Sequence, residues 1–207
     1  MNKVSVVVML SIMVLMIKPD QVQAGESSEY LLYSSLSSQF FALTKEHNDR
    51  WQKAVDNLEE QRILQLSELN SAAAFDRHAK ALADYEQATR TYHTFLKELR
   101  QRTTAHLRSD ELTDEQLEPV VESLMKNHLA LKSAQMKVLA AHLRRVKTMN
   151  NYLTFLDANQ ANWVLQNGQV EFENLELKEQ NIQFESQLSY QQNSIESLLK
   201  RLPPDSV

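Results

Sequence analysis

Glycine and proline are almost absent from this chain, and their scarcity restricts its fold more than any other feature. Two glycines and four prolines occur in 207 residues, and the long segment 26–118 contains neither. A β protein of this size needs many tight turns, and these rely on glycine because its backbone adopts positive φ without strain. A few long helices joined by short polar loops are therefore predicted.

Apolar residues recur at every third or fourth position, as expected for helices that bury one face. The fold class predicted is all-α, with three or four long helices in antiparallel hairpins and an elongated single domain over residues 25–207. The number stays open because alanines 72–74 would let one helix continue through residues 70–76. We favour a turn there, capped by Ser71 or Asp76. The predicted helices are 29–70, 76–107, 113–150 and 157–202.

Two short strings predict helix starts. Residues 113–116, Thr-Asp-Glu-Gln, have the form of a capping box, so a helix is expected to begin at Thr113. Pro119 would remove a backbone hydrogen bond, so either the first turn is offset or the helix kinks near Glu115. Residues 156–160, Leu-Asp-Ala-Asn-Gln, predict the start of the last helix with Asp157 as its cap.

A seven-residue apolar repeat runs through the last predicted helix, a pattern typical of coiled coils. It begins at Trp163 and Val170, and Gly168 interrupts it, which predicts a local bend or loop. A coiled-coil-like C-terminal helix suggests either a homodimer partner or a return onto the first helix. The residues predicted for self-association are Leu177, Phe184, Leu188, Ile195, Leu198 and Leu202.

Residues 1–24 have the layout of a secretory signal peptide. A charged start at Lys3 precedes an apolar stretch over 4–17 and a small-residue exit at Ala24. The stretch is shorter than the roughly 20 residues that span a bilayer, so cleavage near Ala24 is predicted, with no transmembrane segment in the mature chain. Because the chain has no Cys, a periplasmic or secreted bacterial protein fits better than a disulfide-stabilised eukaryotic domain.

Charge and motifs narrow the function classes. Residues 25–207 carry a net charge of −6, with 20 Lys and Arg against 26 Asp and Glu, which argues against nucleic acid as a partner. The sequence has no Gly-rich phosphate loop, Gly-x-Ser-x-Gly elbow, His-Glu-x-x-His motif or Cys nucleophile. A non-enzymatic protein with protein partners and no cofactor is predicted.

Six histidines raise the question of a metal site. No two of them are three or four residues apart, so none forms a chelating pair on one helix. His47, His128 and His142 are the candidate ligands, although histidines at the margin of a packed helix explain the pattern better.

Aromatic residues near the start of the first helix are candidates for partner contact. Tyr30, Tyr33, Phe40 and Phe41 give this region more apolar surface than one helix face can bury. Packing in the core is the alternative explanation for most of the aromatic residues.

The strings at 112–116 and 156–160 are similar to the Leu-Thr-x-x-Gln motif of the Spy and CpxP group of periplasmic stress proteins; the second has Asp157 in place of Thr. The resemblance implies a small, cradle-shaped helical dimer that holds unfolded clients or restrains an envelope sensor kinase, with relatives that bind zinc or other metals. No functional residue carries over beyond the two strings.

Three functions follow as hypotheses. The first is a periplasmic binding protein of the chaperone-like or envelope-stress adaptor type. The second is a structural or assembly component of a secretion, conjugation or surface apparatus. The third is a metal-responsive periplasmic protein. Amphipathic helices serve the first two equally well, so the sequence does not separate them.

Overall fold

A computed structural model places most of the chain in long helices. It describes residues 26–60, 66–69, 71–108 and 112–202, apart from the side chains of residues 26–30, 59, 60, 68 and 127. The predicted signal peptide and its cleavage site lie outside these residues. The helices and strands are α1 (Glu26–Glu60), η1 (Leu66–Glu68), α2 (Ala72–Lys97), α3 (Leu99–Leu107), α4 (Asp114–Ala158), η2 (Gln160–Asn162), β1 (Trp163–Gln166), β2 (Gln169–Phe172) and α5 (Leu175–Leu199).

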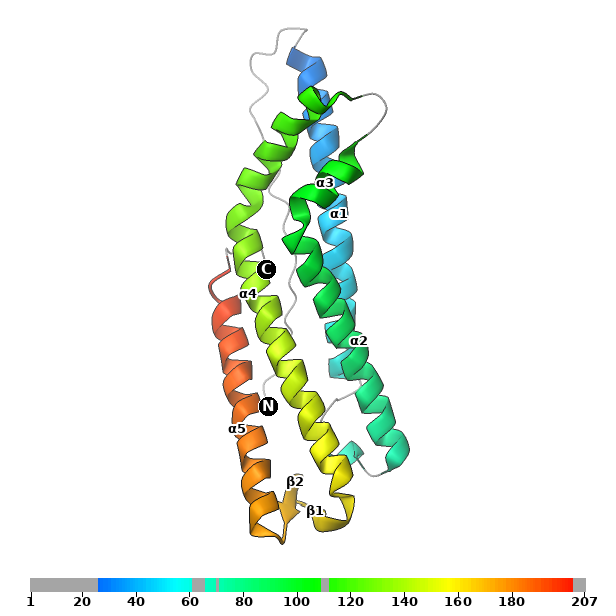
Figure 1. The fold of residues 1–207 in the computed structure, drawn as a ribbon, viewed down its shortest axis with the longest axis vertical. Coiled ribbons are helices and arrows are strands. Elements are labelled where there is room, and N and C mark those ends of the chain that lie inside the picture. Colours follow the sequence, from blue (N-terminus) through cyan, green and yellow to red (C-terminus); the bar gives the residue numbers. More distant parts are fainter. Residues whose placement is uncertain (1–25, 61–65, 70, 109–111, 203–207) are drawn as a thin grey trace.

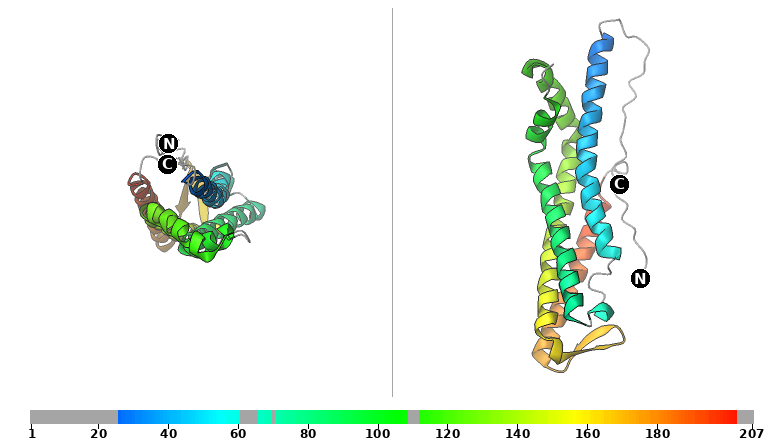
Figure 2. Two further views of the ribbon diagram at one scale, coloured as in Figure 1. Left: turned by 90° about the horizontal axis from the view of Figure 1, so that it is seen from above. Right: turned by 90° about the vertical axis from the view of Figure 1, so that its right-hand side faces the viewer.

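The four longest helices run alternately up and down an elongated molecule (Figure 1). The predicted all-α class and antiparallel arrangement are therefore confirmed. α1 packs on α2, α2 on α4, and α4 on α5, and the helices form an open arc when viewed along the long axis (Figure 2). None of the described helices is apolar over a length that would cross a membrane.

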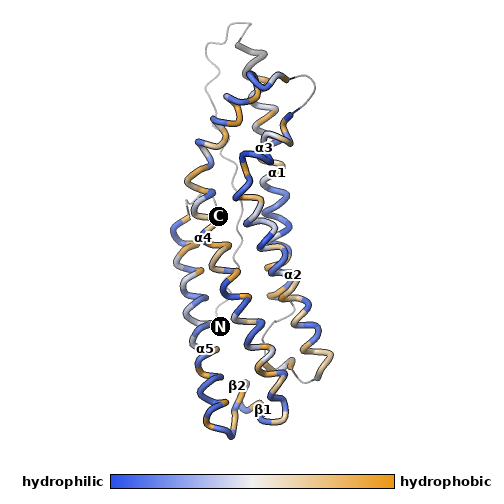
Figure 3. Tube along the Cα trace, in the orientation of Figure 1, coloured by the Kyte–Doolittle hydropathy of each residue, from blue (hydrophilic) through white to orange (hydrophobic). Residues whose placement is uncertain are grey.

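Among the described residues, a hydrophobic core cluster joins the long helices and β2. Figure 3 shows apolar and polar residues alternating along each helix, which is the pattern of helices with one buried face. Complete burial of a large aliphatic or aromatic side chain contributes about 2 kcal/mol to stability. The largest fully buried apolar side chains are Phe40, Phe95, Leu82, Leu96, Leu99, Leu107, Leu117, Leu139, Leu156, Val121 and Val146.

The first two predicted helices have different boundaries in the structure. α1 ends at Glu60 rather than at residue 70, and α2 begins at Ala72 rather than at residue 76. Of the two predicted caps, Ser71 is the one used: its hydroxyl oxygen accepts from the backbone N–H of Ala74 at 3.3 Å. The favoured break near residues 70–76 is present, and a short break at Glu98 separates α2 from α3.

α4 begins as predicted but continues further. Gln116 Oε1 accepts from the backbone N–H of Thr113 at 3.0 Å, so the capping box is confirmed, and the helix runs through Pro119. The predicted end at residue 150 and new start at Asp157 are wrong. Tyr152, with its neighbours Leu153 and Leu156, continues the buried face, and this packing outweighs the local polar sequence.

A β-hairpin replaces the first part of the last predicted helix. β1 and β2 pair antiparallel from Trp163 with Phe172 to Gln166 with Gln169. Asn167 and Gly168, with φ values of 54° and 79°, form the turn. Asn-Gly is a favoured sequence for such a two-residue turn because both residues tolerate positive φ. The helix predicted over 157–202 is therefore restricted to α5.

Candidate functional site

Side chains at the end of α4 fix the start of the hairpin. The indole N–H of Trp163 donates to the carbonyl oxygen of Leu156 at 2.9 Å. The side-chain amide of Asn159 donates to the carbonyl oxygen of Phe155 at 2.8 Å. Both carbonyls belong to the last turn of α4, where C=O groups have no partner within a helix. The hairpin therefore leaves α4 at a defined position.

An aromatic cluster joins the hairpin and α5 to α4. The ring centroid of Phe155 lies 5.3 Å from that of Phe172 and 5.4 Å from that of Phe184. Tyr152 stacks on Phe184 at 5.3 Å, and its hydroxyl donates to Oδ1 of Asn181 at 2.8 Å. Such aromatic pairs contribute about 0.5–1.5 kcal/mol each beyond the area that they bury. The cluster holds β2, α4 and α5 together.

An open groove lies between β1 and η1. It encloses about 270 Å³, and β1 contributes to its lining whereas β2 does not. Leu69 forms a buried part of its wall with 3% of the residue exposed, whereas Leu165 is 41% exposed. The lining residues are Leu66, Ser67, Leu69, Gln160, Trp163 and Leu165.

The end of the molecule that carries this groove is both apolar and acidic. Val164 is 62% exposed and Leu175 is 70% exposed. Segment 157–179 contains five acidic residues and one basic residue, Lys178. This end therefore offers exposed apolar side chains in a field of negative charge, which favours apolar ligands that also carry positive charge.

A buried polar cluster lies between α1, α2 and α4. The indole N–H of Trp51 donates to Oγ1 of Thr89 at 3.2 Å, and the Tyr85 hydroxyl and Nδ1 of His142 share a hydrogen bond. Burial, and to a smaller degree the nearby Arg145 cation, lowers the pKa of His142 to about 4. Burial also raises the pKa of Tyr85. His142 and Tyr85 are therefore neutral near pH 7, and their hydrogen bond connects α2 to α4.

The three histidines predicted as metal candidates lie in separate surroundings. The ring of His128 meets that of Phe40 edge-on at 5.4 Å, and His47 stacks on Phe95 at 3.9 Å. Burial is the largest cause of the lowered pKa of both histidines. Among the described residues, no group of three or more His, Cys, Asp or Glu is placed to hold a metal ion.

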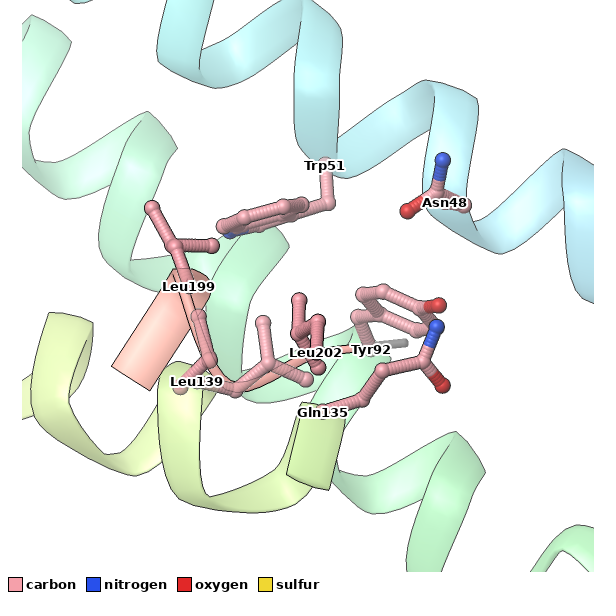
Figure 4. Close-up of a pocket in the computed structure, with 8 residues that line it drawn as sticks. Asn48, Trp51, Tyr92, Gln135, Leu139, Leu199 and Leu202 are labelled. Atoms are coloured by element: carbon pink, nitrogen blue, oxygen red, sulfur yellow. The ribbon is translucent and has the colours of Figure 1, made fainter. Parts of the chain in front are cut away.

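A small cavity lies where the end of α5 reaches α1. Its volume of about 10 Å³ corresponds to roughly one water molecule, which is too small for a ligand. Figure 4 shows Leu199 and Leu202 lying between Trp51 of α1 and Leu139 of α4. The other lining residues are Asn48, Tyr92, Gln135 and Val138.

The aromatic residues predicted for partner contact are largely used inside the chain. Phe40 is 1% exposed, and Phe41 is half-buried with its ring 5.5 Å from that of Phe40. Tyr33 is half-buried and its hydroxyl lies 3.4 Å from Oγ of Ser123. The side chain of Tyr30 lies outside the described residues. Tyr33 and Phe40 thus help to join α1 to α4.

Most of the apolar repeat predicted for self-association packs within the same chain, where α5 lies against α4. Ile195 and Leu202 are buried, with 2% and 7% exposed, and Phe184 belongs to the aromatic cluster. The remaining members are half-buried: Leu177, Leu188 and Leu198. Intramolecular packing therefore accounts for this repeat, and self-association through it stays a prediction.

The sequence reasoning missed the hairpin and with it the groove. The available signal was the Asn167-Gly168 pair between two short segments with alternating apolar residues, which is a strong local indication of a hairpin. Neither the known protein families, nor the curated proteins, nor the solved structures contain a match to this chain.

Proposed function

We propose that the chain is a non-enzymatic, exported binding protein that holds segments of other polypeptides. The observation that carries this proposal is the groove beside β1, which Leu165 lines, together with two exposed apolar residues at the same end of the molecule: Val164 on the opposite face of the hairpin and Leu175 at the start of α5. Apolar surface of this kind, gathered next to a groove, is typical of protein interaction sites. Export is proposed from the layout of residues 1–24.

The chaperone-like function implied by the resemblance to the Spy and CpxP group is in keeping with this proposal. The first of the two strings marks the start of α4, at Thr113. The second lies across the end of α4, around Asp157, so it no longer supports the resemblance as a helix start. The proposal therefore rests on the groove rather than on the strings.

Binding to an unfolded polypeptide tests the proposal. The probe is a reduced and alkylated, fluorophore-labelled protein that stays unfolded, and the measurement is fluorescence anisotropy. We expect saturable binding, and we expect the double variant Val164→Ser, Leu175→Ser to weaken it about tenfold because two exposed apolar side chains are lost. Both positions are more than 60% exposed, so the fold should be retained.

A matched control is available at the opposite end of the molecule. Leu31 and Leu129 are 66% and 64% exposed, and Leu129 lies about 44 Å along α4 from its C-terminal end. The double variant Leu31→Ser, Leu129→Ser should bind within twofold of the original protein. Equal loss of affinity in both double variants would show that binding is general to apolar surface and would contradict a site at the hairpin.

A second candidate function, a self-assembling structural component, is favoured by the outward face of α5. Ile182 and Tyr190 are 51% and 77% exposed, and Glu185 is the only charged residue in segment 180–195. Low charge around exposed apolar side chains is typical of interface cores. Light scattering should then give a dimer mass that the double variant Ile182→Glu, Tyr190→Glu reduces to a monomer mass. Leu129→Glu is the control, and a monomer mass for the unmodified protein would contradict this function.

A further inference from the structure

In the part of the chain that the structure describes, the hairpin has an unpaired strand edge on the side of the groove. Within the described residues its sheet consists of β1 and β2 alone, and β2 packs against α5. The outer edge of β1 therefore has no strand beside it in the described part of the chain. An exposed strand edge presents backbone N–H and C=O groups that can pair with another chain.

The register identifies the backbone groups that face outward. In a two-residue turn, the C=O of Gln166 faces the N–H of Gln169, so the backbone polar groups of Gln166 point towards β2. Along a strand these groups alternate from side to side. Those of Val164 therefore also point towards β2, whereas the N–H and C=O groups of Trp163 and Leu165 point away from it.

The groove extends along this same edge. The side chains of Trp163 and Leu165 lie on the face of the hairpin that also carries buried Val170 and Phe172, because directly paired residues share a face. Both side chains line the groove. A strand added beside β1 would therefore place every second side chain over the apolar wall that includes Leu69.

The negative charge near the hairpin further restricts which residues the bound segment can carry. The opposite, exposed face of the hairpin carries Glu171 paired with Val164, and Glu173 and Glu176 follow within five residues. On this face an added strand would lie beside Val164 and Gln166, and two strand spacings, about 10 Å, from Glu171. Long Lys or Arg side chains reach towards the carboxylate over this distance, and the negative charge of segment 157–179 favours them over Asp or Glu.

From these features we infer that β1 accepts an extended polypeptide segment as a third strand, with apolar residues at alternate positions and Lys or Arg between them. Main-chain hydrogen bonds to Trp163 and Leu165 supply affinity, and the groove supplies selectivity for apolar side chains. This inference rests on the proposed function and names its ligand and its mode of binding.

Two substitutions at one residue separate the backbone from the side chain. Leu165→Pro removes an outward N–H without removing a hydrogen bond to β2, whereas Leu165→Ala keeps the N–H and shortens the side chain. The probe is a fluorophore-labelled nine-residue peptide of alternating Val and Lys. Leu165→Pro should weaken binding at least tenfold, and Leu165→Ala no more than about threefold. Equal affinities of the two variants would overturn strand addition.

Modified peptides test the same inference on the unmodified protein, so the result does not depend on how Leu165→Pro folds. In one peptide, alternate residues are N-methylated so that the N–H groups along one edge are blocked. In a second peptide, N-methylation blocks the N–H groups along the other edge. One of these peptides should lose binding at least tenfold. Replacing Lys by Glu should have a similar effect, and full binding by all of these peptides would overturn the inference.

The outcomes distinguish the inference from the proposed function. If neither the unfolded protein nor the peptide binds, both fail. A second outcome is that the unfolded protein binds, that the double variant Val164→Ser, Leu175→Ser binds it more weakly, and that the edge-blocked peptides bind normally. In that case the proposed function stands and strand addition fails. The protein is also mixed with phosphatidylcholine vesicles, with or without phosphatidylglycerol, and sedimented. If it sediments with the vesicles and does not bind the peptide, the exposed apolar residues contact a lipid surface and the inference is overturned.

Discussion

Replacing Trp51 by alanine is expected to lower the free energy of unfolding by about 4 kcal/mol, the usual range for a fully buried Trp or Phe. Trp51 is 3% exposed and lies where α1 meets α2 and α4. Its loss would leave a cavity beside the His142 ring, whose centroid is 5.3 Å away. It would also remove the hydrogen bond to Thr89. Urea unfolding followed by circular dichroism measures this change.

The conservative variant Trp51→Phe provides the comparison. It keeps an aromatic ring in the cavity but loses the indole N–H, so a cost of about 1–2 kcal/mol is expected. Exposed Leu129, at 64%, supplies a surface control, because Leu129→Ala should change stability by less than about 0.5 kcal/mol. A cost below 1 kcal/mol for Trp51→Ala would mean that α1 is not held by this junction.

Acidification is expected to destabilise the protein through His142. Its pKa is about 4 in the folded state, against about 6.5 in the unfolded chain. Below pH 6.5 the unfolded chain therefore binds a proton that the folded protein does not, so stability falls as the pH decreases from about 6.5 to 4. At about 1.4 kcal/mol for each pH unit, the total loss is about 3 kcal/mol.

His142→Gln isolates this contribution from that of the carboxylates. Glutamine does not titrate, and its side-chain amide can still hydrogen-bond with the Tyr85 hydroxyl. Between pH 7 and 4.5, the unmodified protein should lose about 2 kcal/mol more stability than the variant, because the remaining titratable groups are common to both. Parallel stability curves would show that His142 is already protonated in the folded state or reaches solvent.

The sequence predicted those features that depend on local chemistry repeated over many residues. The scarcity of glycine and the apolar spacing indicated antiparallel long helices, and the capping box at Thr113 marked the start of α4. Helix ends were less predictable. Residues 150–157 resemble a helix break, yet Tyr152, with Leu153 and Leu156, keeps α4 continuous because tertiary burial outweighs local propensity.

The candidate site was predicted less well than the fold. Trp163 and Val170 fit the seven-residue repeat, but they belong to strands, since an Asn-Gly turn favours a hairpin over a continued helix. The groove also needs η1, which lies about a hundred residues earlier in the chain. Its formation depends on tertiary contacts between distant segments, and periodicity within one segment does not reveal such contacts.

Because α4 is long and packs against several helices, only certain changes in its length preserve the packing of the molecule. Its 45 residues extend over about 68 Å and contact α1, α2, α3 and α5. Inserting one residue midway would rotate one half of the molecule by about 100° relative to the other, so the packing on one side of the insertion would no longer match. Seven inserted residues would restore the orientation to within about 20° and lengthen the molecule by about 10 Å. Related chains of different length should therefore differ in α4 by multiples of about seven residues, with matching changes in its neighbours.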